Sequence, residues 1–147
     1  MKILIINYSR VGDSILSTAL IKHLLDEYPK SQISIVTSSI SKDLFKRMPR
    51  LENLIVIDKK KYSLHWFDIW KLVIDQKWDL TIDLRSSYLS YIIRTKKYKI
   101  FKGNNKFSKV EQLRKFLNTS KEISPYIWLN KKDIFESKKL LSGNAPY

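Results

Sequence analysis

Short apolar runs alternate with amphipathic stretches along almost the whole chain, and this alternation limits the fold more than any other feature. The runs have the length and β-branched character of buried strands and span 3–6, 32–37, 54–58, 79–84 and 98–101. The stretches between them repeat apolar residues at helical steps and span 14–28, 42–48, 66–76, 86–94 and 110–117, with a final helix beginning near Lys131. Strands that alternate with helices form a parallel sheet covered on both faces. The sequence therefore predicts an α/β fold, a Rossmann-like doubly wound parallel sheet.

The composition suits one folded domain. Hydrophobic residues make up 44% of the 147 residues, which is enough to build a core. There is no cysteine, so disulfides and thiolate chemistry are excluded. No apolar run approaches the roughly 20 residues that cross a bilayer, and the chain enters a strand at once, without a signal-peptide layout. We therefore expect a cytoplasmic protein, in peripheral contact at most with the cytoplasmic membrane.

The charge is strongly positive, with 28 Lys and Arg against 14 Asp and Glu and a net charge of +14. Such a surplus favours anionic partners: nucleic acid, acidic lipid headgroups or phosphorylated glycans. It is densest between Arg94 and Lys115, where nine basic residues accompany one acid, Glu111. This stretch is typical of a cationic surface that faces a polyanionic acceptor or a membrane rim, and equally of a solvated face.

The loop after the first strand is the first candidate site. Ligands of doubly wound folds bind at the carboxyl ends of the strands, and the loop 9–13 lies there. It holds a single glycine, Gly12, so it is neither a dinucleotide fingerprint nor a P-loop. Asp13 could accept a proton at the start of the following helix, while Gly12 would let a substrate come close. The alternative is that Asp13 only caps this helix.

The segment 83–87 ends the fourth strand at the same edge of the sheet. Arg85 could bind a carboxylate or phosphate through two hydrogen bonds. Ser86 or Ser87 could cap the next helix, and the alternative is that the whole segment serves only turn and cap chemistry. His23 and His65 have no acidic neighbours at ligand spacing, so we expect no metal site. Asp58 also follows a strand, but Asn7-Tyr8 is not the acidic pair that a phosphoacceptor domain carries after its first strand.

Several blocks of the sequence, in the same order along the chain, resemble the N-terminal half of glycosyltransferase family 9, the lipopolysaccharide heptosyltransferase family. The opening block, 3–18, is similar to the family's first strand, its S-x-x-G-D loop and the following helix. The block 78–87 is similar to the family's D-x-x-I-D-L-[QR]-G segment. Further matches are 24–29, 110–113 and 126–129.

The resemblance implies one half of a two-domain enzyme of the GT-B type. The N-terminal domain would hold the acceptor, a lipopolysaccharide-core or related glycan, anionic or lipid-linked. The C-terminal domain would bind the nucleotide-sugar donor, typically ADP-heptose, with no other cofactor and no metal. Asp13 matches the family's proposed general base for an inverting transfer. The expected acceptor-binding residues are Ser9, Arg10, Gly12, Arg85 and Ser86.

Two departures from the family pattern affect these expectations. The chain ends about where the second domain should begin, so we expect an N-terminal domain over 1–141, the start of an interdomain linker over 142–147, and no transferase activity from these 147 residues alone. Ser86 also stands where the family frequently has glycine.

An alternative is a non-catalytic basic α/β module that binds nucleic acid or anionic lipid. The charge between Arg94 and Lys115 favours it. No helix-turn-helix, RRM or KH signature is present, so specific nucleic-acid binding is not expected. The oligomeric state is left open.

Overall fold

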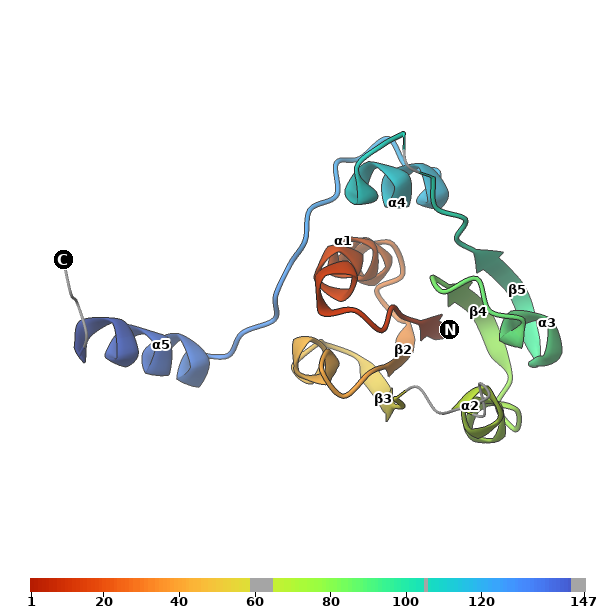
Figure 1. Ribbon diagram of the computed structural model, residues 1–147, viewed down its shortest axis with the longest axis horizontal. Coiled ribbons are helices and arrows are strands. Elements are labelled where there is room, and N and C mark those ends of the chain that lie inside the picture. The colour runs from red at the N-terminus through yellow and green to blue at the C-terminus, as the bar shows by residue number, and fades with distance from the viewer. Residues whose placement is uncertain (59–64, 105, 144–147) are drawn as a thin grey trace.

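The computed structural model describes residues 1–58, 65–104 and 106–143. Within them, the strands form one parallel sheet in the order β3-β2-β1-β4-β5 (Figure 1). The strands are β1 (Lys2–Ile6), β2 (Gln32–Thr37), β3 (Leu51–Val56), β4 (Trp78–Asp83) and β5 (Thr95–Ile100). The predicted parallel α/β sheet is confirmed.

Helices cover both faces of this sheet. In the described residues they are α1 (Val11–Glu27), the short 3₁₀ helix η1 (Lys42–Leu44), α2 (His65–Val73), α3 (Leu89–Ile92), α4 (Lys109–Leu117) and α5 (Lys131–Gly143). Residues of α1 and α4 share one apolar cluster with the sheet, and residues of α2 and α3 share the other. The doubly wound arrangement is therefore confirmed. Helix α5 stands apart from the sheet at the end of an extended segment (Figure 1).

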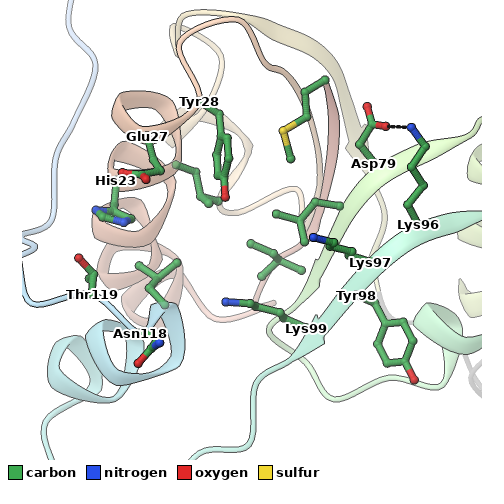
Figure 2. A pocket seen from close by; sticks show the side chains of 15 residues that line it. His23, Glu27, Tyr28, Asp79, Lys96, Lys97, Tyr98, Lys99, Asn118 and Thr119 are labelled. Atoms are coloured by element: carbon green, nitrogen blue, oxygen red, sulfur yellow. Dashed lines mark hydrogen bonds and ion pairs between the residues drawn. The ribbon is translucent and has the colours of Figure 1, made fainter.

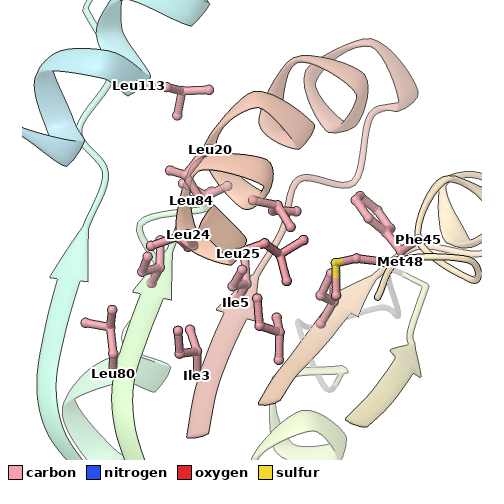
Figure 3. Close-up of a cluster of buried hydrophobic side chains, with 14 of the residues drawn as sticks. Ile3, Ile5, Leu20, Leu24, Leu25, Phe45, Met48, Leu80, Leu84 and Leu113 are labelled. Atoms are coloured by element: carbon pink, nitrogen blue, oxygen red, sulfur yellow. The ribbon is translucent and has the colours of Figure 1, made fainter. Parts of the chain in front are cut away.

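The central strand β1 shows why its sequence is continuously apolar. Ile3 and Ile5 pack toward α1, in the cluster drawn in Figure 3, and Leu4 and Ile6 pack toward α2 and α3. All four side chains are fully buried. A strand that is covered on both faces cannot alternate with polar residues, because every position faces a core.

Several element boundaries differ from the predicted ones, and the outer strands β3 and β5 each begin three residues earlier than predicted. Helix α1 begins at Val11, three residues before the predicted start, because Gly12 and Asp13 join its first turn. Helix α3 is only four residues long, because hydrogen bonds to Asp83 hold the residues before it and β5 begins already at Thr95. The predicted helix 42–48 is reduced to the single turn η1. Of the predicted linker 142–147, the first two residues belong to α5, and the rest lies outside the described residues.

The strand order places a topological switch point at one edge of the sheet. From β1 the chain moves outward through β2 and β3, and it then returns to place β4 on the other side of β1. Ligands of open α/β sheets bind where the order reverses in this way, outside the carboxyl ends of the strands. Here that point lies between the ends of β1 and β4, and we call it the switch crevice.

Candidate functional site

Asp13 lies in the first turn of α1, beside the switch crevice. The helix is capped at Arg10, whose side chain makes no capping hydrogen bond, so the alternative that Asp13 is the N-cap is wrong. The Asp13 side chain is 34% exposed, and its Oδ1 lies 4.0 Å from Nζ of Lys109. The positive end of the helix dipole favours a negative charge at this position. The Asp13 carboxyl is therefore accessible and close to one cation.

Lys109 and Tyr8 complete the surroundings of Asp13, and the sequence did not single out either residue. The Lys109 ammonium lies 4.4 Å from the centre of the Tyr8 ring and 4.8 Å from that of Phe101. The Tyr8 hydroxyl is buried and has no hydrogen-bond partner among the described residues. Burial, followed by the negative charges of Asp13 and Asp83, raises the pKa of the Tyr8 phenol, so it stays neutral. The surroundings of Asp13 thus include the Lys109 ammonium and a neutral, buried phenol whose hydroxyl has no partner among the described residues.

Asp83, the last residue of β4, organises the other wall of the crevice. Its carboxylate is fully buried and accepts hydrogen bonds from the backbone amides of Arg85 and Ser87, each at 2.8 Å. It also accepts from the hydroxyls of Ser87, at 2.5 Å, and Ser90, at 3.3 Å. Burial raises the pKa of Asp83, although these hydrogen bonds oppose the shift. The predicted alternative of turn chemistry therefore describes Asp83 and Ser87. The prediction that Ser86 or Ser87 caps the next helix is wrong, because the N-cap of α3 is Tyr88, which makes no side-chain capping hydrogen bond.

Arg85 projects toward the opposite face of the sheet from Lys109. Its guanidinium carbon lies 4.5 Å from the centre of the Trp66 ring, in the first turns of α2. Burial lowers the pKa of Arg85, and the nearby Asp83 opposes this shift. A guanidinium stacked on an aromatic ring keeps its planar edge free for a carboxylate or phosphate. Arg85 and Lys109 are thus held over the two faces of the sheet at the same edge.

The remaining expected acceptor-binding residues lie along the crevice loop. The Ser9 carbonyl accepts a hydrogen bond of 3.0 Å from the Ser38 hydroxyl, which ties the loop to the end of β2. Arg10 is exposed and follows it. A Cβ atom added to Gly12 would meet nothing within 4 Å, so the space above the first turn of α1 is open.

The conformation of Ser86 accounts for its departure from the family pattern. Its φ is 53°, in the left-handed region that glycine adopts most easily. The Ser86 hydroxyl donates a 2.5 Å hydrogen bond to the Phe101 carbonyl at the end of β5. Serine therefore strains the backbone at this position more than glycine would, but its hydroxyl makes a contact between two loops that glycine cannot make.

We expect Ser86→Gly to keep the free energy of unfolding within about 1 kcal/mol of the wild type, because relief of the left-handed strain offsets one lost hydrogen bond. Ser86→Val should lower it by about 2 kcal/mol, because a β-branched residue is poorly accommodated at positive φ and makes no such bond. Urea unfolding followed by tryptophan fluorescence measures both. Equal losses in the two variants would contradict this role of the backbone.

The basic stretch from Arg94 to Lys115 does not form one continuous surface. Lys97 and Lys99 face a cavity of about 710 Å³ between β5, α1 and α4, whereas Tyr98 points away from it (Figure 2). Lys96 pairs with Asp79 at 2.6 Å. This cavity reaches Met1 and Asp79, at the amino ends of β1 and β4, so it lies at the edge opposite the switch crevice.

The other acidic and histidine positions add no site. The Asp58 carboxylate accepts hydrogen bonds from the backbone amide and hydroxyl of Ser39, which lower the pKa of Asp58. In the part of the chain that the structure describes, no group of three or more His, Asp and Glu side chains is arranged to hold a metal ion. None of the helices there is long and apolar enough to cross a membrane.

The chain is similar in sequence and in fold to known glycosyltransferases. No protein-family model matches the chain. Over 120 residues it is 28% identical to lipooligosaccharide heptosyltransferase 2 of Haemophilus ducreyi, a match that covers 78% of this chain and 34% of the relative. The chain thus spans about a third of the length of that curated relative.

Two solved structures have the same fold. A glycosyl transferase family 9 protein from Veillonella parvula superposes with a TM-score of 0.72 at 21% identity, over 97% of this chain and 49% of that one. The ADP-heptose lipopolysaccharide heptosyltransferase II of E. coli gives a TM-score of 0.63 at 16% identity, over 97% of this chain and 51% of that one. The fold and the resemblance to an N-terminal portion of family 9 are confirmed.

Proposed function

We propose that this chain is the acceptor-side half of a glycosyltransferase of the heptosyltransferase type. The observation that carries the proposal is Asp13, an accessible carboxylate in the switch crevice with the Lys109 ammonium 4.0 Å away. The similarity to heptosyltransferases supports the class of reaction. The proposed donor is a nucleotide-sugar such as ADP-heptose, held mainly by a second, donor-binding half.

The proposed reaction is an inverting transfer that needs no metal. Asp13 accepts the proton of an acceptor hydroxyl as the oxygen attacks the anomeric carbon of the sugar. The new glycosidic C–O bond forms while the bond from that carbon to the diphosphate oxygen breaks. The nucleoside diphosphate leaves with the electron pair, and the proton remains on the Asp13 carboxyl until solvent removes it.

The proposed acceptor is an anionic glycan of the lipopolysaccharide core or a related lipid-linked glycan. Lys109 and Arg85 are held over the two faces of the sheet at the crevice, and Arg10 is exposed in the loop after β1. Cations arranged in this way suit carboxylate and phosphate substituents around a neutral hydroxyl. We propose that the protein acts at the cytoplasmic face of the membrane, in peripheral contact with the lipid that carries the acceptor.

Binding of the acceptor tests this assignment without the transfer step. We expect an anionic core oligosaccharide titrated calorimetrically into the protein to bind, and Lys109→Gln to weaken the binding about tenfold, because one charge-assisted contact is lost. Lys106→Gln is the matched control, because Lys106 is exposed in the same segment and bonds Asn104 through its backbone amide, which the substitution leaves in place.

Equal weakening by both substitutions would indicate a non-specific charge effect and would remove Lys109 from the acceptor site. Salt-sensitive binding of DNA, with no affinity for the oligosaccharide, would instead favour the non-catalytic basic module.

A further inference from the structure

An exposed aromatic surface surrounds α3. Tyr88, Tyr91 and Ile92 are 86%, 59% and 59% exposed, and Tyr98 on the neighbouring strand β5 is 49% exposed. We call these four residues the α3 surface. Single exposed apolar residues are common, but four on two adjacent elements form a patch of the kind that marks an interaction site.

The packing of α3 shows that the core does not require this surface. Leu89 and Ile93 of the same segment are buried in the apolar cluster with β1 and α2. The exposed residues therefore project from the opposite side of a helix that is already anchored. The Tyr91 and Tyr98 rings contact each other edge to face, with centroids 5.3 Å apart, so the patch is continuous from α3 to β5. Figure 1 shows α3 and β5 side by side at the edge of the molecule away from α5.

Cations flank the aromatic residues. Arg94 is exposed between α3 and the outer strand. Lys96 lies on the same side of β5 as Tyr98, because side chains alternate along a strand, and its side chain is 76% exposed although it pairs with Asp79. Tyrosine has an apolar ring and a polar hydroxyl, which suits the boundary between headgroups and acyl chains. Basic residues beside such rings are attracted to anionic headgroups.

We propose that the α3 surface docks onto the surface of an anionic lipid bilayer. Tyr88, Tyr91, Tyr98 and Ile92 enter the headgroup region, and Arg94 and Lys96 lie against lipid phosphates. This inference rests on the proposed function in one respect: it assigns a surface to the membrane contact proposed above.

Two other occupants fit the chemistry less well. A second copy could pair through the edge strand β5, but this strand carries three lysines, which discourage strand addition, and two chains of charge +14 repel each other. Nucleic acid needs cations along a groove with flat rings to stack on its bases. Ile92 cannot stack, and it is among the most exposed residues of the patch.

The position of the surface relates it to the switch crevice. Ser87, which is hydrogen-bonded to Asp83 at the crevice wall, directly precedes Tyr88. A bilayer that contacts the α3 surface therefore lies next to the crevice, so the glycan of a lipid-anchored acceptor has only a short distance to reach Asp13.

Flotation with vesicles tests the surface with a matched pair of variants. We expect the protein to float with phosphatidylcholine vesicles that contain about 30% phosphatidylglycerol, and to lose most of this binding between about 50 and about 300 mM salt, as a contact between opposite charges does. Ile92→Ser should lower the partition coefficient about tenfold, because an inserted apolar side chain is lost. Ile40→Ser, the same change at a residue that is 72% exposed in another part of the molecule, should leave it unchanged.

Tyr88→Ser provides a second variant that should not disturb folding, because the Tyr88 side chain is almost entirely exposed. Wild-type flotation of both Ile92→Ser and Tyr88→Ser would overturn the proposal, and so would equal loss in Ile40→Ser. Loss of single-stranded DNA binding in these two variants, without any vesicle binding by the wild type, would assign the surface to nucleic acid and also overturn it. Flotation involves no sugar transfer, so its failure is distinguishable from failure of the transferase assignment.

Discussion

Asp13→Asn is expected to lower the rate of sugar transfer by about 10³-fold or more, because an amide cannot accept the proton of the attacking hydroxyl. The substitution keeps the size and shape of the side chain, which is partly exposed and contacts Lys109 only at 4.0 Å. We therefore expect little change in the free energy of unfolding. The measurement is kcat with a nucleotide-sugar donor, in a polypeptide that joins this chain to a donor-binding half.

Asp26→Asn is the matched control for this experiment. Asp26 lies on the same helix, is 65% exposed and pairs with Lys22 across one turn, so the substitution makes the same chemical change away from the crevice. It should leave kcat unaltered. Turnover of Asp13→Asn at the wild-type rate would remove the general-base assignment, even if the acceptor still bound.

Asp83→Ala is expected to lower the free energy of unfolding by about 3 kcal/mol. The fully buried carboxylate accepts from two backbone amides and two hydroxyls at the β4–α3 turn, and alanine leaves these donors without an acceptor. Each unsatisfied buried donor costs about 1–3 kcal/mol, reduced here by water that enters the loosened turn. Urea unfolding measures the loss, and a decrease below about 1 kcal/mol would contradict the role of Asp83 in organising the turn.

The raised pKa of Asp83 makes the free energy of unfolding depend on pH, in a direction that follows from the sign of the shift. Because the folded protein holds this proton more tightly than the unfolded chain, the associated stability is fully present below the unfolded value of about 3.9 and is lost as pH rises through the raised folded pKa. Asp83→Asn lacks this component, so the difference in the free energy of unfolding between wild type and variant should show it as a function of pH.

Asp79, on the same strand, provides a control in which the pKa shift has the opposite direction. Hydrogen bonds from Lys96 and from the Lys2 amide lower the pKa of Asp79, so its contribution is present above the unfolded value and is lost as pH falls. The difference curves of Asp79→Asn and Asp83→Asn should therefore slope in opposite directions, and equal slopes would contradict the assignment.

The sequence predicted the central strands well because they are buried on both faces. Ile3, Leu4, Ile5 and Ile6 all face a core, and a short apolar run bounded by polar loops is typical of such a strand. The start of α1 was harder to predict, since Gly12 and Asp13 are as compatible with a first turn as with a loop. Helix α3 was too short for its periodicity to show where it ends.

The candidate site was only partly predictable, for a physical reason. Asp13 and Asp83 follow strands, and the end of a strand can be recognised in the sequence. Lys109 reaches Asp13 only because α4 packs beside α1, and no local pattern records that contact. The basic stretch could not be assigned to one surface from its sequence, because successive residues of a strand point to opposite faces. Lys97 and Lys99 face the cavity, whereas Tyr98 between them points away from it (Figure 2).

The position of β1 in the middle of the sheet has a consequence during synthesis on the ribosome. The Lys2 amide donates a hydrogen bond to the Asp79 carboxylate, 77 residues later, and β1 pairs with β4 along this same boundary. At about 5–20 residues per second, the nascent strand waits roughly 4–15 seconds for that neighbour to emerge. During this interval the apolar strand β1 has one unpaired edge. We therefore expect the nascent chain to be a substrate for chaperones before it has folded.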